Sequence, residues 1–248
     1  MEDLLDILKN FFVPRFCLEN YPNLISGSDK EFRLAFPMTC FCDLPLSQLH
    51  EHLDFYGGYG IGLKKEWGIV NKINPVLYLH QNSDLSSYIR SLLAGFREGR
   101  DRNKGNGNEN AGFSDTSGMF SILSILRHVK LYDGYVKDGR RDMYKRFYDE
   151  REWRWVPFLT DNKNTDILSL TEEEFNDLPV RLKADSEVAG MAKLSFAPND
   201  IKYIVVSAEN EIMTIMKLIE RIYESYDIEL IKLLYTKIVS AEQIKEDF

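Results

Sequence analysis

The chain has 248 residues, 44% of them hydrophobic and 28% charged, which is the composition of an ordinary globular protein with a core of its own. A formal net charge of −8 disfavours general binding to nucleic acid or to a membrane surface, because both need a positive field. No apolar run approaches the ~20 residues that span a bilayer. Three cysteines without a secretory leader indicate reduced thiols and a cytoplasmic protein.

The first part of the chain predicts short helices and strands in alternation. Residues 1–12 have the apolar spacing of an amphipathic helix, and residues 32–42 predict one or two strands. Residues 46–55 predict a short helix, and residues 57–62 predict a turn that leads into a strand. Residues 83–96 again show helical spacing of apolar side chains.

Residues 97–115 follow neither a helical nor a strand pattern. They are polar, rich in Gly and Asn, and nearly devoid of apolar side chains. Such a composition cannot bury enough apolar surface to offset the loss of chain entropy. The sequence therefore predicts a mobile polar loop here.

The second part of the chain mixes both kinds of element. Residues 117–129 predict a helix, and residues 150–158 alternate like a strand. Thr171 and the glutamate three positions later match a capping box, which predicts the start of a short helix. Residues 209–223 predict the strongest helix, and residues 230–239 predict a final strand region.

These elements are interleaved irregularly and show no internal repeat. No glycine-rich turn joins a strand to a helix in a dinucleotide-binding unit, which disfavours a Rossmann or P-loop architecture. We therefore expect a single α+β domain over residues 1–248. Its sheet should be mixed or mainly antiparallel and flanked by helices.

Cys40, Cys42, His50 and His52 have the composition of a zinc site. The geometry argues against one, because two histidines two positions apart on a helix point about 200° apart. The alternative is two small buried thiols and surface histidines, and we expect no metal. Cys42 is also a poor nucleophile, because the neighbouring carboxylate of Asp43 raises a thiol pKa.

The segment Tyr56-Gly-Gly-Tyr-Gly-Ile-Gly62 permits two interpretations. Its glycines lack side chains, so backbone amides could approach a ligand closely, with Tyr56 and Tyr59 beside them. The other interpretation is a tight turn flanked by packing tyrosines. Lys64 could attract an anionic ligand or be a solvated surface cation.

The segment Glu150-Arg-Glu152-Trp-Arg154 is the second candidate. On a strand, Glu150, Glu152 and Arg154 share one face, and the tryptophans lie on the other. The two carboxylates could serve as an acid and a base or bind a ribose. The alternative is a structural face of cross-strand ion pairs over a core packed by tryptophan.

Several blocks of the chain resemble the AbiGi family of abortive phage-resistance proteins, over about residues 20 to 210. The first block comprises Cys40-Phe-Cys-Asp-Leu-Pro-Leu-Ser, His52, Tyr56-Gly, Tyr59-Gly-Ile-Gly-Leu-Lys-Lys-Glu-Trp-Gly and Pro75-Val-Leu-Tyr. The later ones are Tyr148-Asp-Glu-Arg-Glu-Trp-Arg and Leu194-Ser-Phe-Ala-Pro-Asn-Asp-Ile-Lys-Tyr-Ile-Val-Val. The resemblance implies an antiphage protein that is the antitoxin of a two-gene system. It also implies a protein partner, the cognate toxin, and requires neither catalysis nor a cofactor.

The order of a strand, a Tyr-Gly segment and a later Glu-x-Glu strand also resembles ADP-ribosyltransferase-like folds. That resemblance implies an alternative function, an enzyme that transfers a glycosyl group from NAD. The candidate catalytic residues are then Glu150 and Glu152, and the candidate ligand-binding residues are His52, Tyr56, Tyr59, Lys64 and Arg154. This alternative requires the Tyr-Gly turn and the Glu-x-Glu strand to face one cleft.

Overall fold

The computed structural model describes residues 1–21, 32–105, 121–138, 141–157 and 169–247. Its α-helices are α1 (Glu2–Asn10), α2 (His50–Tyr56), α3 (Lys65–Val70), α4 (Asp84–Gly105), α6 (Glu172–Asn176), α7 (Leu178–Met191), α8 (Ile212–Ile222), α9 (Ile228–Tyr235) and α10 (Ala241–Asp247). Its short 3-10 helices are η1 (Leu46–Gln48), η3 (Phe147–Glu150), η5 (Pro198–Asp200) and η6 (Glu209–Glu211). Its strands are β1 (Arg15–Tyr21), β2 (Phe32–Cys42), β3 (Gly60–Leu63), β4 (Asn74–Pro75), β5 (Leu77–Leu79), β6 (Val129–Leu131), β7 (Gly134–Asp138), β8 (Arg141–Lys145), β9 (Glu152–Trp155), β10 (Leu170–Thr171), β11 (Ile201–Val206) and β12 (Ile238–Ser240).

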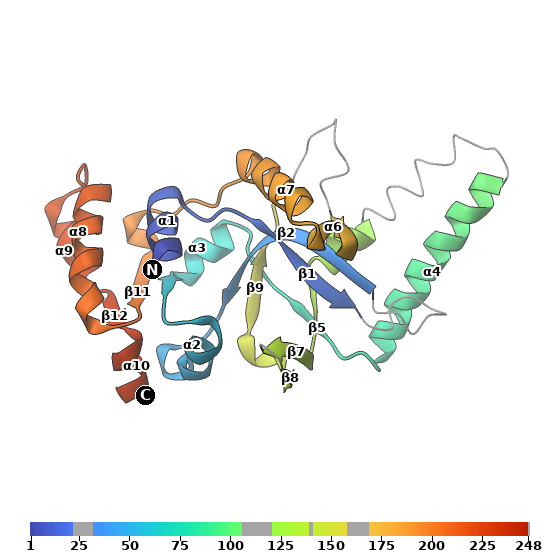
Figure 1. Ribbon diagram of the computed structural model, residues 1–248, viewed down its shortest axis with the longest axis horizontal. Helices are drawn as coiled ribbons and strands as arrows, with labels where there is room; N and C mark the ends of the chain where they lie inside the picture. The colour runs from blue at the N-terminus through green and yellow to red at the C-terminus, as the bar shows by residue number, and fades with distance from the viewer. Residues whose placement is uncertain (22–31, 106–120, 139–140, 158–168, 248) are drawn as a thin grey trace.

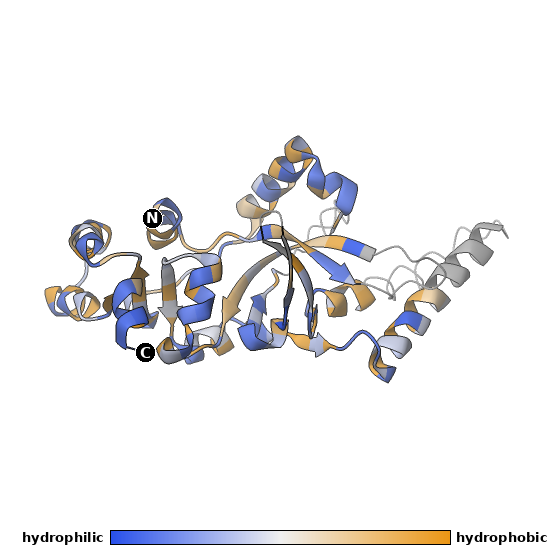
Figure 2. Cartoon of the chain, turned by 60° about the horizontal axis from the view of Figure 1, so that its bottom comes forward, coloured by the Kyte–Doolittle hydropathy of each residue, from blue (hydrophilic) through white to orange (hydrophobic). Residues whose placement is uncertain are grey.

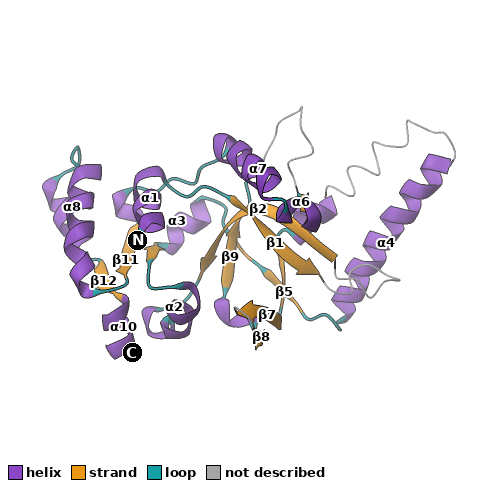
Figure 3. Ribbon diagram, in the orientation of Figure 1, coloured by secondary structure: helices purple, strands orange, loops and turns teal. Residues whose placement is uncertain are grey.

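The fold is α+β, with strands in the middle and helices around them (Figure 3). The central sheet has the order β1-β2-β9-β4, and β10 also pairs with β2. All of its pairings are antiparallel. This confirms the expected class and the mainly antiparallel sheet.

A smaller sheet, β12-β11-β3, lies near the N-terminal end of the elongated molecule (Figure 1). β11 and β12 run parallel, and α8 and α9 form the connection between them. These helices pack with α1 over the largest apolar cluster, which includes Leu8, Ile204, Ile215 and Leu234. A parallel pair β5–β6 and an antiparallel hairpin β7–β8 complete the strands described.

The strand register assigns the side chains of the central sheet to two faces. Glu152 lies opposite Cys42, and Arg154 lies opposite Cys40, so these side chains share what we call the charged face. Trp153 and Trp155 point the other way and pack against the cluster under α1 and α3. On this opposite face, which we call the apolar face, α7 covers a further apolar cluster that contains Phe16, Ala35 and Val188.

Several predicted elements are confirmed. The N-terminal helix buries Leu4 and Leu8, and residues 32–42 form the single strand β2. Thr171 caps α6 with the expected capping box, because its hydroxyl accepts from the Glu174 amide while the Glu174 carboxylate accepts from the Thr171 amide. The strongest helical pattern forms η6 followed by α8.

The mobile loop expected over residues 97–115 is wrong for residues 97–105, because α4 continues to Gly105. Arg, Glu and Lys have high intrinsic helix propensity, so a polar stretch can prolong a helix that apolar contacts have already started. Residues 106–115 lie outside the described residues.

The strand expected over residues 230–239 is also wrong over most of its length. Residues 230–235 belong to α9, and only the last positions enter β12. Ile231 and Leu234 are buried at helical spacing, and the Asp227 carboxylate accepts a hydrogen bond from the Glu229 amide at the helix start.

The helix predicted over residues 117–129 is confirmed over residues 121–126 and wrong at its end, while residues 117–120 lie outside the described residues. Residues 121–126 are helical, whereas Val129 begins β6 and pairs in parallel with β5. Among the described residues, no helix is both long and apolar enough to cross a membrane.

Candidate functional site

The two candidate glutamates lie at the junction of η3 and β9. The sequence predicts both on one strand, but Glu150 ends η3 and the strand begins only at Glu152. Arg151 separates them with a left-handed backbone (φ 45°), which turns the chain into the strand. Glu152 and Arg154 share one face, as strand alternation predicts, and both are buried.

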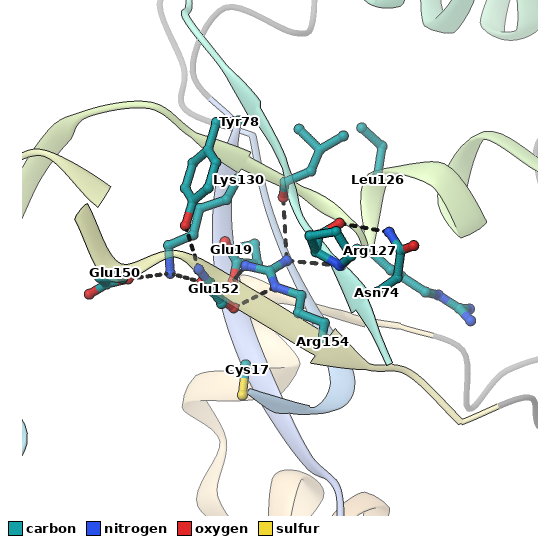
Figure 4. A network of polar contacts seen from close by, with 12 residues as sticks. Cys17, Glu19, Asn74, Tyr78, Leu126, Arg127, Lys130, Glu150, Glu152 and Arg154 are labelled. Carbon is teal, nitrogen blue, oxygen red and sulfur yellow. Dashed lines mark hydrogen bonds and ion pairs between the residues drawn. The ribbon is translucent and has the colours of Figure 1, made fainter. Parts of the chain in front are cut away.

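Arg154 is the centre of the site and has no exposed surface. Its Nε donates to Glu152 Oε1 at 2.6 Å, and its Nη2 donates to Glu19 Oε1 at 2.6 Å. Its Nη1 donates to the Arg127 carbonyl oxygen at 2.9 Å (Figure 4). Burial alone would lower the pKa of Arg154, but the carboxylates of Glu19 and Glu152 outweigh burial and raise it.

Lys130 on β6 continues the chain of ion pairs from Glu152 to Glu150. Its Nζ lies 2.6 Å from Glu152 Oε2 and 3.4 Å from Glu150 Oε2 (Figure 4). Burial would raise the pKa of Glu152, but Arg154 and Lys130 outweigh burial and lower it to about 2. The Tyr78 hydroxyl accepts from the Glu152 amide at 2.7 Å and so fixes the start of the strand.

The outer end of the site reaches α2 and β8. Lys145 Nζ lies 2.7 Å from Glu150 Oε1, and the Tyr56 hydroxyl donates to the same oxygen. The Lys145 ammonium also lies 3.7 Å from the centroid of the Phe55 ring. Burial would raise the pKa of Glu150, but Lys130, Lys145 and the Tyr56 hydroxyl outweigh it and lower the pKa.

We call this set the ion-pair network. It holds three carboxylates and three cations, together with the hydroxyl of Tyr56, and it ties together six elements of the fold. Its members are Glu19 on β1, Tyr56 on α2, Lys130 on β6, Lys145 on β8, Glu150 at the end of η3, and Glu152 and Arg154 on β9.

The structure brings some of the predicted ligand-binding residues together and gives the others different partners. His52 stacks on the Tyr56 ring with 4.5 Å between centroids, and burial lowers the pKa of His52. The Tyr59 hydroxyl instead donates to Glu211 Oε1 at 2.7 Å, before α8. The Lys64 amide donates to the Asp200 carbonyl oxygen at 2.9 Å, at the start of β11.

Sequence reasoning missed three charged members of the network. Lys130 is a single cation in β6, Glu19 is a single carboxylate in β1, and Lys145 ends β8. Only Lys130 carried a signal, an isolated charge between apolar neighbours in Val129-Lys130-Leu131. That signal does not reveal the partner carboxylate.

The cysteines and histidines of the possible zinc site have separate neighbours. His50 Nδ1 lies 3.7 Å from Asp54 Oδ2, while His52 stacks on Tyr56. In the part of the chain that the structure describes, no three or more His, Cys, Asp or Glu side chains are grouped so as to hold a metal ion. Burial raises the pKa of the Cys42 thiol, with smaller contributions from nearby carboxylates including Asp43.

The chemistry open to the network follows from these pairings. Glu150 and Glu152 are ionised at neutral pH, and each contacts at least one lysine or arginine. A general acid needs a raised pKa, whereas both of these pKa values are lowered. The network is therefore suited to fixing β9 against β6 and β1 rather than to moving protons.

Two comparisons relate the chain to known proteins. A family model described as "Putative abortive phage resistance protein AbiGi, antitoxin" matches residues 10–207. The chain is 29% identical over 263 residues to the abortive phage resistance protein AbiGi of Lactococcus lactis subsp. cremoris, which covers 96% of this chain and 99% of that protein. No solved structure matches the chain. The whole ion-pair network and α7 lie within the matched residues, whereas α8, α9 and α10 follow them.

Proposed function

The chain belongs to the AbiGi family of abortive phage resistance proteins, and from this premise we propose that it is the antitoxin of a two-gene system. In this proposal it acts in the cytoplasm through a protein partner, the cognate toxin encoded beside it. The observation that carries the proposal is the family match over residues 10–207, whose description includes the antitoxin role.

The ion-pair network supports action by binding rather than by catalysis. Glu150 and Glu152 contact cations and have lowered pKa values, so neither is poised as a general acid. Burial raises the pKa of Glu19, but its carboxylate is bound by the guanidinium of Arg154. Moving β9 would break a buried ion pair and leave one charge without its partner, which costs free energy. The network therefore holds β9 rigidly in place. A rigid scaffold favours recognition of a protein, because it reduces the entropy lost on binding.

A genetic experiment tests the antitoxin role. Deleting the gene for this chain while keeping its neighbour should make the cells grow poorly, and supplying the chain from a plasmid should restore growth. A plasmid copy with an early stop codon is the control, and it should fail to restore growth. Healthy growth of the deletion strain would contradict the proposal.

One contact favours a second candidate function, glycosyl transfer from NAD. The Tyr56 hydroxyl donates to Glu150, so the Tyr-Gly turn and the glutamate segment do meet, as that function requires. The fit to NAD is poor, however. A ribose hydroxyl would have to compete for these carboxylates with Lys130 and Lys145, which contact them now.

Incubation with NAD tests this second function. An NAD-using enzyme should release nicotinamide, and Glu152→Gln should slow the release if that carboxylate takes part. An unchanged rate in Glu152→Gln would remove this residue from the reaction. Absence of nicotinamide release with every acceptor tested would leave the antitoxin function as the better account.

A further inference from the structure

The helix α7 lies against the apolar face of the central sheet, at the top of the view in Figure 1. It buries Ala184, Asp185 and Val188 on its inner side, beside Phe16. The Asp185 carboxylate accepts a hydrogen bond from the Phe16 amide at 2.8 Å, which fastens the helix to β1. The residues on the inner side of α7 thus serve to hold the helix on the sheet.

The outer side of α7 does not have the composition expected of a solvent-facing surface. Leu178 and Leu182 are 51% and 53% exposed, and Val180 is also exposed near the same end. Met191 is exposed at the far end of the helix. A helix with one face on a sheet usually shows polar residues on the other, whereas α7 carries hydrophobic residues outside its buried side as well (Figure 2).

Leu178 and Leu182 form the centre of this outer surface. They are four positions apart, so their side chains are neighbours on the helix. Single exposed leucines are common on protein surfaces, but two adjacent ones form a small apolar patch. We call Leu178 and Leu182 the α7 patch. Val180 lies two positions from each of them and points about 200° away around the helix, so it is not part of the patch.

Carboxylates precede the α7 patch along the chain. Glu173, Glu174 and Asp177 are exposed, and they lie in α6 or in the turn between the two helices. Residues 172–187 contain six carboxylates and two cations; apart from the buried Asp185, five carboxylates and two cations leave a formal charge of −3 on this surface. Such a surface repels phosphates and attracts a cationic protein.

We propose that the α7 patch is where the chain binds its protein partner, and that the partner is a cationic protein. Its contact surface would place an apolar ridge on Leu178 and Leu182 and set lysine or arginine side chains against Glu173 and Asp177. An apolar centre with a charged rim is the usual anatomy of a specific protein interface. This inference rests on the proposed antitoxin function, because the partner in question is the cognate toxin.

Calorimetric titration of the full-length chain with the purified product of the neighbouring gene tests the proposal. The variant Leu182→Asp should weaken binding by at least about 30-fold, because it places a charge at the centre of the apolar contact. Glu173→Lys should weaken binding by about 10-fold and reduce its dependence on salt, because it removes a long-range attraction. Both positions are exposed, so urea unfolding of these variants should match the wild type.

Leu92→Asp on α4 is the matched control, because Leu92 is also 53% exposed. It should bind like the wild type. If Leu182→Asp binds like the wild type, the docking site proposed for α7 is wrong and the antitoxin function stands. If the wild-type chain does not bind the neighbouring product at all, the proposed function fails and this inference fails with it.

Light scattering tests whether a second copy of this chain, rather than a different protein, binds the α7 patch. The proposal expects the same mass for the wild type and Leu182→Asp in the absence of the partner. A wild-type dimer that becomes a monomer in Leu182→Asp would overturn the proposal, because the patch would then be buried between two copies.

Discussion

The two faces of the central sheet are held in opposite ways. The apolar face buries tryptophan and phenylalanine side chains against α1, α3 and α7. The charged face buries Glu150, Glu152 and Arg154, which pair with the partly exposed Glu19, Lys130 and Lys145 (Figure 4). Beside these charges it also buries an apolar cluster that contains Tyr21, Phe36 and Met38. Apolar packing tolerates substitution in proportion to the surface removed, whereas a buried charge depends on each individual partner.

The ion-pair network and the α7 patch therefore have different roles, one in holding the fold and the other in binding a partner. The polar groups of the ion-pair network bind one another. They therefore fix the arrangement of the strands and leave few hydrogen-bonding groups for a ligand. The α7 patch is the reverse, because its side chains are exposed and contribute little to the fold. The contrast predicts that variants of the network change stability and that variants of the patch change binding.

The largest effect is expected from Arg154→Met. This variant leaves the buried carboxylates of Glu19 and Glu152 without their shared cation, and it should lower the free energy of unfolding by about 3–5 kcal/mol. Urea unfolding measures this change. The control is Arg146→Met, which removes an exposed pair with Asp149 and should leave the unfolding midpoint unchanged. Equal midpoints for the two variants would contradict the central role of Arg154.

Glu152→Gln should show a pH dependence that the apolar face lacks. The folded-state pKa of about 2 lies below the ordinary 4.5, so the carboxylate stabilises the fold above pH 4.5 and loses that effect as the pH falls toward 2. The shift corresponds to about 3 kcal/mol at neutral pH. Urea unfolding between pH 7 and pH 3 should therefore show the wild type and Glu152→Gln converging.

Trp153→Ala tests the same strand from its apolar side. The side chain is half-buried against the cluster under α1 and α3, so its loss should cost about 2 kcal/mol. No titrating group is removed, so the difference from the wild type should be the same at pH 7 and pH 4. A difference that shrinks with acid would show that the two faces are not energetically separate.

The smallest effect is expected from Tyr56→Phe, which removes the hydroxyl that donates to Glu150. The bond is half-buried and accepted by a carboxylate, so the loss should be about 1 kcal/mol. Tyr59→Phe is the comparison, because its bond to Glu211 is exposed and should contribute less. If Tyr59→Phe lowered the free energy of unfolding more than Tyr56→Phe in the same urea titration, the Tyr59 hydrogen bond would contribute more to stability, contrary to this prediction.

The sequence predicts the elements that depend on local spacing. The helix at residues 1–12, the capping box at Thr171 and the shared face of Glu152 and Arg154 follow from periodicity and capping chemistry. The end of α4 and the helix α9 were not predicted, because polar helix formers and continuous apolar runs fit more than one element.

The candidate site was only half predictable for a related reason. Tyr56 and Glu150 were both named from motifs, and the fold brings them into contact. Of their cations, Lys130 comes from β6, which pairs with the distant β5, and Lys145 comes from β8 in the hairpin β7–β8. No local pattern distinguishes a lysine that will be buried beside a carboxylate from one that will be solvated.

We infer that this chain acts through the α7 patch rather than through its carboxylates. This is tested by the survival of cells that carry the neighbouring gene together with Leu182→Asp or Glu152→Gln, at matched levels of folded protein. We expect Leu182→Asp to fail to protect the cells and Glu152→Gln to protect them. Protection by Leu182→Asp, or loss of protection in folded Glu152→Gln, would show that the α7 patch is not the acting surface.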